Sequence, residues 1–288
     1  MKIGSSTYSF ARLIRNGMKL EEVFDKTKEL GYDQTEVGGL RPPDGTDVFE
    51  YAAHIRQYCE KIGLEIGCYT VGGDFLRGEG KDPSDEVERL KKEVDIAVAL
   101  GVDRMRTDVI PWSYLGPMSF RQVKDAISPY IRSVAEYAKT RGIVIGLENH
   151  GYFIQEGDRM LALIEAVDHP NFGACIDIGN FLCADDDPIY AVSQLAAYAH
   201  FVHVKDFLWK DGAAPSPGSD WIVTRGGNYI RGTIIGHGVV PIPQCIKILR
   251  DAGYNGGLSL EFEGPEEPLH AIKASQEYLC RIKKELSV

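Results

Sequence analysis

The chain has 288 residues, of which 44% are hydrophobic and 26% are charged, a composition typical of a globular protein with a substantial core. This composition excludes a disordered or fibrous protein. The formal net charge of −10 at pH 7 argues against a nucleic-acid partner, because binding to a phosphate backbone depends on clustered lysine and arginine.

Short runs typical of buried β-strands recur along the whole chain. In order they are KIGSSTYSF from Lys2, YDQTEVGG from Tyr32, LEIGCYTVGG from Leu64, VDRMRTDVI from Val102, IVIGLENHG from Ile143, FGACIDIG from Phe172, FVHVKDF from Phe201 and GLSLEFEG from Gly257. Segments with apolar residues at the i, i+3, i+4 spacing of a helix separate them. Several of these helices are expected to end at a glycine, namely Gly31, Gly63, Gly101, Gly142 and Gly253.

Eight strands alternating with eight helices predict a single α/β domain over residues 1–288 that forms a (β/α)8 TIM barrel. A doubly wound open sheet would give the same alternation. The barrel is favoured because no G-x-G-x-x-G turn follows the first strand and because eight units close naturally.

The connection after the seventh strand is longer than the others and rich in glycine and proline. Loops that follow the strands of a barrel form the face on which active sites lie, and a long loop in a compact domain is usually functional. We therefore expect residues 207–240 to be an active-site loop insertion that forms a lid or wall over the pocket.

The cysteines and the hydrophobic profile bear on the cellular compartment. The six cysteines form no C-x-x-C pair, which indicates buried free thiols in a reducing compartment. The N-terminal segment lacks the apolar core of a signal peptide, and no apolar stretch reaches the roughly 18 residues of a membrane span. We expect a cytoplasmic protein that does not bind membranes.

Charged residues inside strands that are buried on both faces require an explanation. Because side chains alternate along a strand, the run from Ile143 directs Glu148 into the barrel while its apolar residues pack on helices. The same parity directs Asp177, His203 and Glu261 inward. Each of the four late strands thus offers one ligand-type side chain near its carboxyl end.

A divalent cation explains this convergence, since three buried carboxylates alone would repel one another. Oxygen ligands with one imidazole favour Mn²⁺, with Mg²⁺, Co²⁺ and Zn²⁺ as alternatives.

A competing interpretation is that each charge pairs separately with a basic residue, for instance Glu148 with Lys205. Likewise, Arg104, Arg106 and Asp108 share the inward face of the fourth strand, and we expect them to pair with one another rather than to contact substrate.

Several further residues are candidates for substrate binding. His150 shares the inward face of the fifth strand, where it would bind a substrate hydroxyl. Lys205 is either a substrate ligand or the partner of a site carboxylate. Tyr8 and Trp112 lie on predicted loop ends, where a sugar ring can stack or where aromatic side chains pack on the rim. Arg231, in the insertion, binds either a phosphate or its own loop.

The motifs LENHG, CIDIGNF, HVKDF and LSLEFEG, in this order, resemble the xylose-isomerase-like TIM barrel superfamily, which is also the AP endonuclease family 2 type. Its members include sugar phosphate isomerases and epimerases, ketose 3-epimerases, inosose dehydratases and endonuclease IV. The resemblance implies a metal held by Glu148, Asp177, His203 and Glu261, with the two glutamates also shuttling protons. Asn180 stands where many relatives carry histidine.

The expected function is a metal-dependent isomerase or epimerase of carbohydrate metabolism, acting on a ketose, keto-sugar or related polyol ketone through an enediolate. The alternative is an inosose-dehydratase-type lyase that uses the same site. An endonuclease IV-like repair enzyme is disfavoured, because two sets of its additional zinc ligands are missing. Asn180 replaces one histidine ligand, and the loop after His203 contains no Asp-x-His pair. A non-catalytic sugar-binding subunit and a homo-oligomer are left open.

Overall fold

The computed structural model describes residues 1–76, 82–111, 114 and 116–288. Parallel strands close into a barrel in the hydrogen-bonded order β1-β11-β7-β6-β5-β4-β3-β2, which confirms the (β/α)8 prediction and excludes the open sheet. The barrel strands are β1 (Lys2–Ser6), β2 (Gln34–Gly38), β3 (Glu65–Val71), β4 (Arg104–Thr107), β5 (Val144–Glu148), β6 (Phe172–Asp177), β7 (Ala199–Val204) and β11 (Gly257–Leu260).

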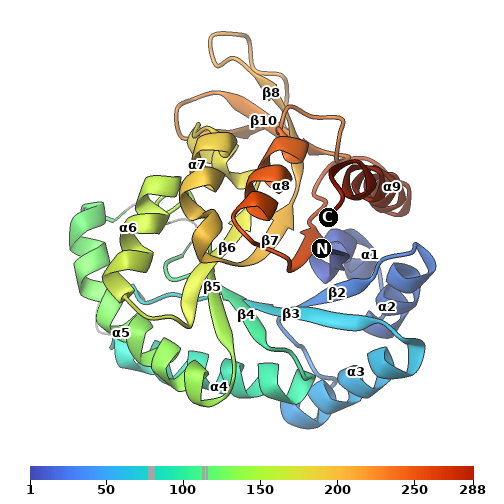
Figure 1. Ribbon diagram of the computed structural model, residues 1–288, viewed down its shortest axis with the longest axis vertical. Coiled ribbons are helices and arrows are strands. Elements are labelled where there is room, and N and C mark those ends of the chain that lie inside the picture. Colours follow the sequence, from blue (N-terminus) through green and yellow to red (C-terminus); the bar gives the residue numbers. More distant parts are fainter. Residues whose placement is uncertain (77–81, 112–113, 115) are drawn as a thin grey trace.

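Helices surround the barrel (Figure 1). They are α1 (Ala11–Arg15), α2 (Leu20–Glu29), α3 (Val48–Ile62), α4 (Pro83–Leu100), α5 (Phe120–Thr140), α6 (Gly157–Val167), α7 (Pro188–Leu195), α8 (Ile242–Asp251) and α9 (Pro268–Leu286). Short 3-10 helices are η1 (Thr7–Phe10), η2 (Asn180–Ala184) and η3 (Ala196–Tyr198).

Local sequence signals set the helix boundaries. Asp47 caps the start of α3 by accepting hydrogen bonds from the backbone of Phe49 and Glu50, and Gly63 ends that helix with φ of 67°. The other predicted terminal glycines, Gly31, Gly101, Gly142 and Gly253, also have positive φ.

The first predicted strand was too long. The run from Lys2 turns into η1 at Thr7, because the Ser6 hydroxyl accepts a hydrogen bond from the backbone of Tyr8.

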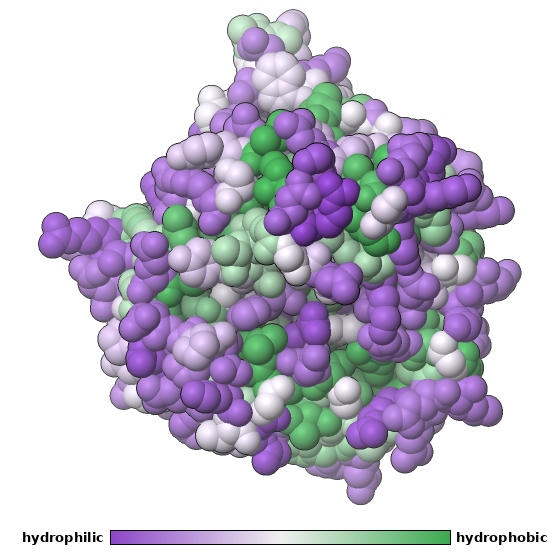
Figure 2. Space-filling view, viewed as in Figure 1, coloured by the Kyte–Doolittle hydropathy of each residue, from purple (hydrophilic) through white to green (hydrophobic). Residues whose placement is uncertain are grey.

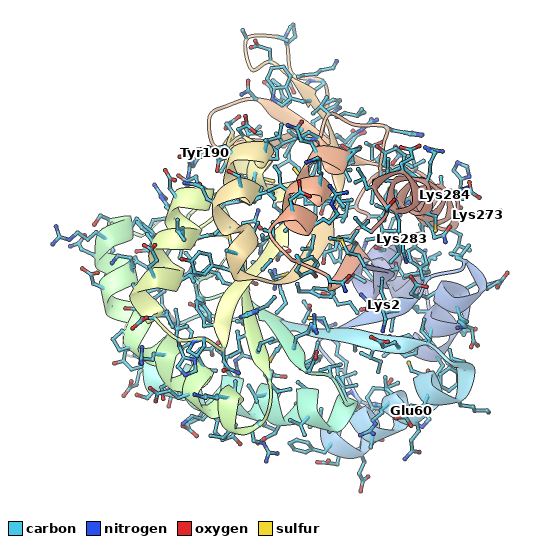
Figure 3. All side chains as sticks on the ribbon, viewed as in Figure 1. Lys2, Glu60, Tyr190, Lys273, Lys283 and Lys284 are labelled. Atoms are coloured by element: carbon cyan, nitrogen blue, oxygen red, sulfur yellow. The ribbon has the colours of Figure 1, made fainter. Side chains whose placement is uncertain are left out.

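The main core lies between the outside of the barrel and the helices, where residues such as Ile145, Leu147 and Val202 are buried. On the face shown in Figure 2, hydrophilic side chains dominate, with apolar groups in scattered patches. Glu60 and Lys284 illustrate how charged side chains lie on the exterior of the helices (Figure 3). No helix among the described residues combines the length and apolar character needed to cross a membrane.

The barrel interior is closed off below the strand ends by small and neutral groups. Gln34 extends from β2 across the interior, and a Cβ added at Gly4, Gly67 or Gly257 would collide with its side chain. Another buried cluster contains Cys68, Cys175 and Phe201. All six cysteines are free thiols.

The 207–240 segment is more ordered than the loop that the sequence suggested. It contributes to a three-stranded antiparallel sheet in the order β8-β10-β9, formed by β8 (Asp206–Lys210), β9 (Ile222–Val223) and β10 (Tyr229–Thr233). This sheet projects away from the barrel (Figure 1).

Buried Asp206 anchors the return of this insertion to the barrel. Its carboxylate accepts hydrogen bonds from the backbone N–H groups of Gly236 and Gly238, both at 2.8 Å, and of Val240 at 3.1 Å. A Cβ at Gly238 would overlap Asp206 and the carbonyl oxygen of Phe207, so the approach requires glycine.

Replacing this carboxylate should destabilise the protein. Asp206→Asn replaces one acceptor oxygen by an NH₂ group that faces buried N–H donors, and we expect a loss of roughly 2–4 kcal/mol in the free energy of unfolding. Urea denaturation followed by circular dichroism measures it. Asp220→Asn, at an exposed site in the same insertion, is the control and should stay within about 0.5 kcal/mol of wild type. Equal stabilities of the two variants would contradict the anchoring role.

Candidate metal centre and active site

The four side chains predicted as metal ligands converge at the carboxyl ends of their strands. Glu148 ends β5, Asp177 ends β6, His203 lies on β7, and Glu261 directly follows β11. One ligand atom from each lies within 4.8 Å of the others, and all four residues are buried. Strand alternation and barrel closure together bring them to one point.

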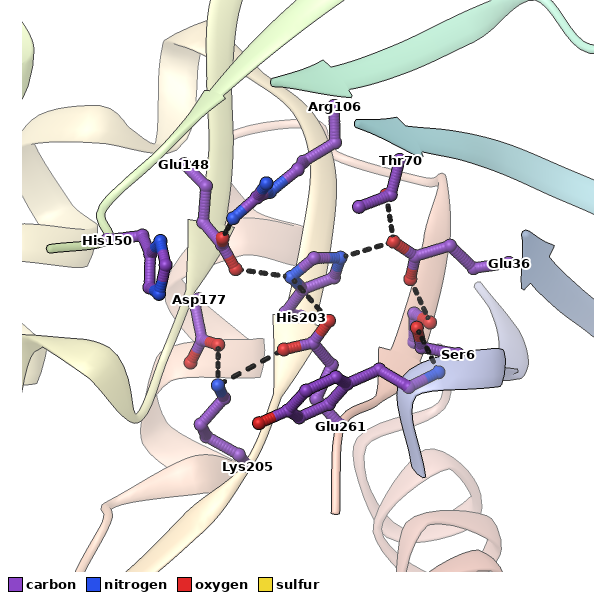
Figure 4. Close-up of polar contacts among 12 residues, drawn as sticks. Ser6, Glu36, Thr70, Arg106, Glu148, His150, Asp177, His203, Lys205 and Glu261 are labelled. Atoms are coloured by element: carbon purple, nitrogen blue, oxygen red, sulfur yellow. Dashed lines mark hydrogen bonds and ion pairs between the residues drawn. The ribbon is translucent and has the colours of Figure 1, made fainter. Parts of the chain in front are cut away.

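His203 occupies the centre of this cluster (Figure 4). Its Nδ1 atom lies 2.6 Å from Glu148 Oε1 and 3.6 Å from Glu261 Oε1. Its Nε2 atom lies 3.0 Å from Glu36 Oε1, on the opposite side of the ring. The imidazole therefore separates the predicted ligand cluster from a fourth carboxylate.

Backbone contacts orient Asp177. Its Oδ1 atom accepts hydrogen bonds from the N–H groups of Gly179 at 2.9 Å and Asn180 at 3.0 Å. The side chain of Asn149 binds the N–H and the carbonyl of the same aspartate, each at 2.8 Å. The second carboxylate oxygen, Oδ2, is buried, and its partner is the Lys205 ammonium, whose Nζ lies 3.1 Å away.

Arg106 on β4 contacts the cluster from its other side. Its guanidinium is paired with Glu148 and, at 3.0 Å, with Asp108. The expected pairing of Arg106 with Asp108 is therefore present. Arg104 is different, since it pairs with Asp103 at 2.7 Å instead of joining them.

Lys205 pairs with carboxylates of the site, which is one of the two roles that the sequence left open for it. Its Nζ atom lies 3.1 Å from both Asp177 Oδ2 and Glu261 Oε2. Burial lowers the pKa of Lys205, but Asp177, Glu263 and Glu261 raise it well above its ordinary value. Lys205 is therefore a fixed positive charge beside the two ligands. The predicted pairing of Lys205 with Glu148 is not the one observed.

The carboxylates of the site differ in their proton affinity. Burial raises the pKa of Asp177 above its usual value despite the nearby Lys205. Burial acts in the same direction on Glu261, but His203 and Lys205 hold the pKa of that carboxyl below its usual range. Burial lowers the pKa of His203, but the Cys175 thiol and the carboxylates of Glu261 and Glu36 raise it well above its ordinary value. Opposed environments within one cluster are typical of functional sites.

Charge and donor chemistry show that these residues fit a divalent cation. The buried side chains of the site comprise four carboxylates and two permanent cations. They are Glu36, Glu148, Asp177 and Glu261, with Arg106 and Lys205. When the imidazole is neutral, as it must be to bind a metal, two negative charges remain uncompensated, and burying such a charge is costly. Three carboxylates and one imidazole nitrogen at this spacing form a donor set suited to a metal ion.

A cavity of about 1140 Å³ opens directly above the cluster. Glu148, Glu261 and Lys205 line its floor, and predicted substrate ligands Tyr8 and His150 line its wall. The Tyr8 hydroxyl donates to Glu263 at 2.9 Å, and His150 Nδ1 lies 3.1 Å from Asp108. From the insertion, Ile222 also lines the cavity.

One predicted substrate ligand among the described residues, Arg231, does not line this cavity. Arg231 on β10 lies with its guanidinium carbon 5.4 Å from the ring centroid of Trp221 and 3.7 Å from Asp220, so it contacts its own insertion, and it is absent from the cavity wall. Trp112 lies outside the described residues.

Sequence reasoning missed Glu36, the buried carboxylate on β2. The signal was present in the run YDQTEVGG, where Glu36 shares the inward parity of Gln34. Its partner on β7 is 167 positions away, so only the closed barrel shows the contact.

Relatives with known names are similar to most of this chain. A 3-oxo-isoapionate decarboxylase of Pectobacterium atrosepticum is 25% identical over 73% of this chain and 70% of its own length. An inosose dehydratase of Mesomycoplasma hyopneumoniae is 21% identical over 91% of this chain and 88% of its own length. A 3-dehydroshikimate dehydratase of Neurospora crassa is 25% identical over 63% of this chain and 55% of its own length.

Solved structures share the fold. An L-ribulose 3-epimerase superposes with a TM-score of 0.75 at 16% identity, covering 99% of this chain and 95% of the other. A Mycobacterium smegmatis barrel protein in complex with magnesium gives a TM-score of 0.74 at 18% identity, with 100% and 98% coverage. The model of one family, described as xylose isomerase-like TIM barrel, matches residues 24–282. The chain therefore belongs to the xylose isomerase-like TIM barrel family.

Proposed function

We propose that this protein is a divalent-metal-dependent isomerase or epimerase of a ketose, keto-sugar or related polyol ketone. The observation that carries the proposal is the placement of Glu148 and Glu261 on opposite sides of one cluster at the floor of an open cavity. β5 and β11 are separated in the barrel by β6 and β7, so their carboxylates approach a bound molecule from different directions. The L-ribulose 3-epimerase with the same fold supports this reaction class.

Glu148, Asp177, His203 and Glu261 would hold the metal, and Mn²⁺ is the ion we propose. When bound, such a cation polarises the carbonyl of a hydroxy-ketone and acidifies the neighbouring C–H bond. Two proteins of similar fold are described with bound zinc and with magnesium. The identity of the divalent ion in this protein is therefore to be measured.

The side chains then supply the proton transfers. One glutamate accepts the proton from the carbon beside the carbonyl, which gives an enediolate. The glutamate on the opposite side returns a proton to the same carbon, and the configuration there is inverted. Return of the proton to the adjacent carbon isomerises the sugar instead. Lys205 directs its positive charge at the same floor and stabilises the negative oxygen that develops.

A lyase is the second candidate, and the names of the relatives favour it. The curated relatives include an inosose dehydratase and a 3-oxo-isoapionate decarboxylase. Loss of a β-hydroxyl from the same enediolate would give an unsaturated ketone. The two candidates therefore share the proton abstraction and differ only in the step that follows it.

NMR in D₂O separates these reactions. With a panel of ketoses, keto-sugars and inososes, we expect deuterium to enter the carbon next to the carbonyl while the substrate keeps its hydroxyl groups. Accumulation of an enone would show the lyase instead.

The glutamates should be indispensable for proton transfer. We expect Glu148→Gln and Glu261→Gln each to lower kcat by about 10³-fold, because an amide cannot accept the proton. Deuterium incorporation with saturating Mn²⁺ measures this loss. Glu136→Gln, at an exposed position on α5, is the matched control and should retain wild-type turnover. If either active-site variant keeps wild-type turnover, its proton-transfer role is wrong.

Metal removal should abolish the reaction. We expect EDTA-treated protein to lose activity and stoichiometric Mn²⁺ to restore it, with elemental analysis giving a single ion per chain. Asp177→Asn should need a higher Mn²⁺ concentration for half-maximal activity, since it lacks one ligand charge. Full activity after EDTA treatment, with no metal detected, would rule out the metal-dependent mechanism.

A further inference from the structure

Glu36 is a fully buried carboxylate for which the proposed proton transfers have no use. It extends from β2 into the barrel and contacts three side chains from other strands (Figure 4). The hydroxyl of Thr70 donates to Oε1, and the hydroxyl of Ser259 donates to Oε2 at 2.7 Å. His203 Nε2 lies 3.0 Å from Oε1.

The hydrogen-bonding capacity of these groups defines the proton position on His203. An ionised carboxylate only accepts hydrogen bonds, and both of its oxygens already face hydroxyl donors. The Nε2 atom beside it must therefore be the donor. An imidazole that binds a metal is neutral and carries a proton on only one nitrogen, so in that state the lone pair lies on Nδ1. Nδ1 is the atom that faces Glu148 at 2.6 Å and Glu261 at 3.6 Å.

Strand pairing places two of these groups side by side. Ser259 on β11 is paired with His203 on the adjacent strand β7, and Glu36 on β2 is paired with Ser6 on β1. A β-bulge between Thr35 and Glu36 shifts the pairing with β3 at this position. All the participating side chains except Thr70 are buried, and each belongs to a strand of the closed barrel.

We propose that Glu36 is a positioning residue that holds the Nε2 proton of His203 and so presents the Nδ1 lone pair to the metal. The inference rests on the proposed function, since it concerns the same metal site. Carboxylates that bind the outer nitrogen of a ligating histidine fix its tautomer and raise its basicity, and their loss typically weakens metal binding 10- to 100-fold.

Glu36→Gln tests the proposal with little change in side-chain volume. Its amide NH₂ can donate to Nε2 and so favours the tautomer whose Nδ1 proton blocks the metal. We expect the Kd for Mn²⁺, measured by competition with a chromophoric chelator, to rise 10- to 100-fold. Glu36→Asp keeps the charge and should recover part of the affinity. Glu86→Gln alters a buried carboxylate on α4 outside the site and should leave the Kd unchanged.

Histidine ¹⁵N NMR gives a readout that does not depend on turnover. In the wild-type protein, with and without Zn²⁺, we expect Nε2 of His203 to carry a proton. In Glu36→Gln that proton should be lost from Nε2 or exchange faster. Thermal unfolding of each variant confirms that the fold is intact.

The results separate this inference from the proposed function. A wild-type Kd for Mn²⁺ in the Glu36→Gln protein, with the Nε2 proton retained, would overturn the role of Glu36. An Nε2 atom without a proton in wild type would overturn it as well. If wild type binds no divalent metal, the metal-dependent function fails, and the Nε2 proton still decides whether Glu36 sets the tautomer.

Discussion

An excess of buried negative charge at the mouth of the barrel is the constraint on which the site depends. Four buried carboxylates face only two permanent cations there, because the closed sheet directs their strands toward one point. Arg106 and Lys205 neutralise part of that charge from opposite sides. The excess that remains is compensated by a proton on His203 or by a bound cation, and only the cation leaves His203 free to act as a ligand.

Sequence reasoning predicted the ligand cluster because two simple rules apply to it. Alternation along a buried strand decides which residues face inward, and parallel strands place their carboxyl ends at one edge. Both rules act within a few residues of Asp177 or Glu261, so no long-range information is needed. The terminal glycines were predictable for the same reason, since a positive φ at Gly63 is a local requirement.

The remaining features depend on contacts between distant segments. The partner of Glu36 is determined by barrel closure and by a β-bulge, neither of which leaves a local pattern. The pairing of Lys205 with Asp177 rather than Glu148 depends on the distance across the barrel. The insertion was expected to be a loop because glycine and proline dominate it, yet antiparallel pairing of β8 with β10 orders it, and Arg231 packs within it.

Asp206 follows Lys205 directly and binds the backbone where the insertion returns to the barrel. The base of the insertion is therefore fixed next to the strand that carries His203, and Thr224 and Asn228 donate hydrogen bonds to Asp185 beyond β6. Changes of length or sequence between residues 211 and 221 are consequently separated from the position of the metal ligands. A barrel built in this way can acquire a new substrate by exchanging one surface segment, while the chemistry at its floor is inherited unchanged.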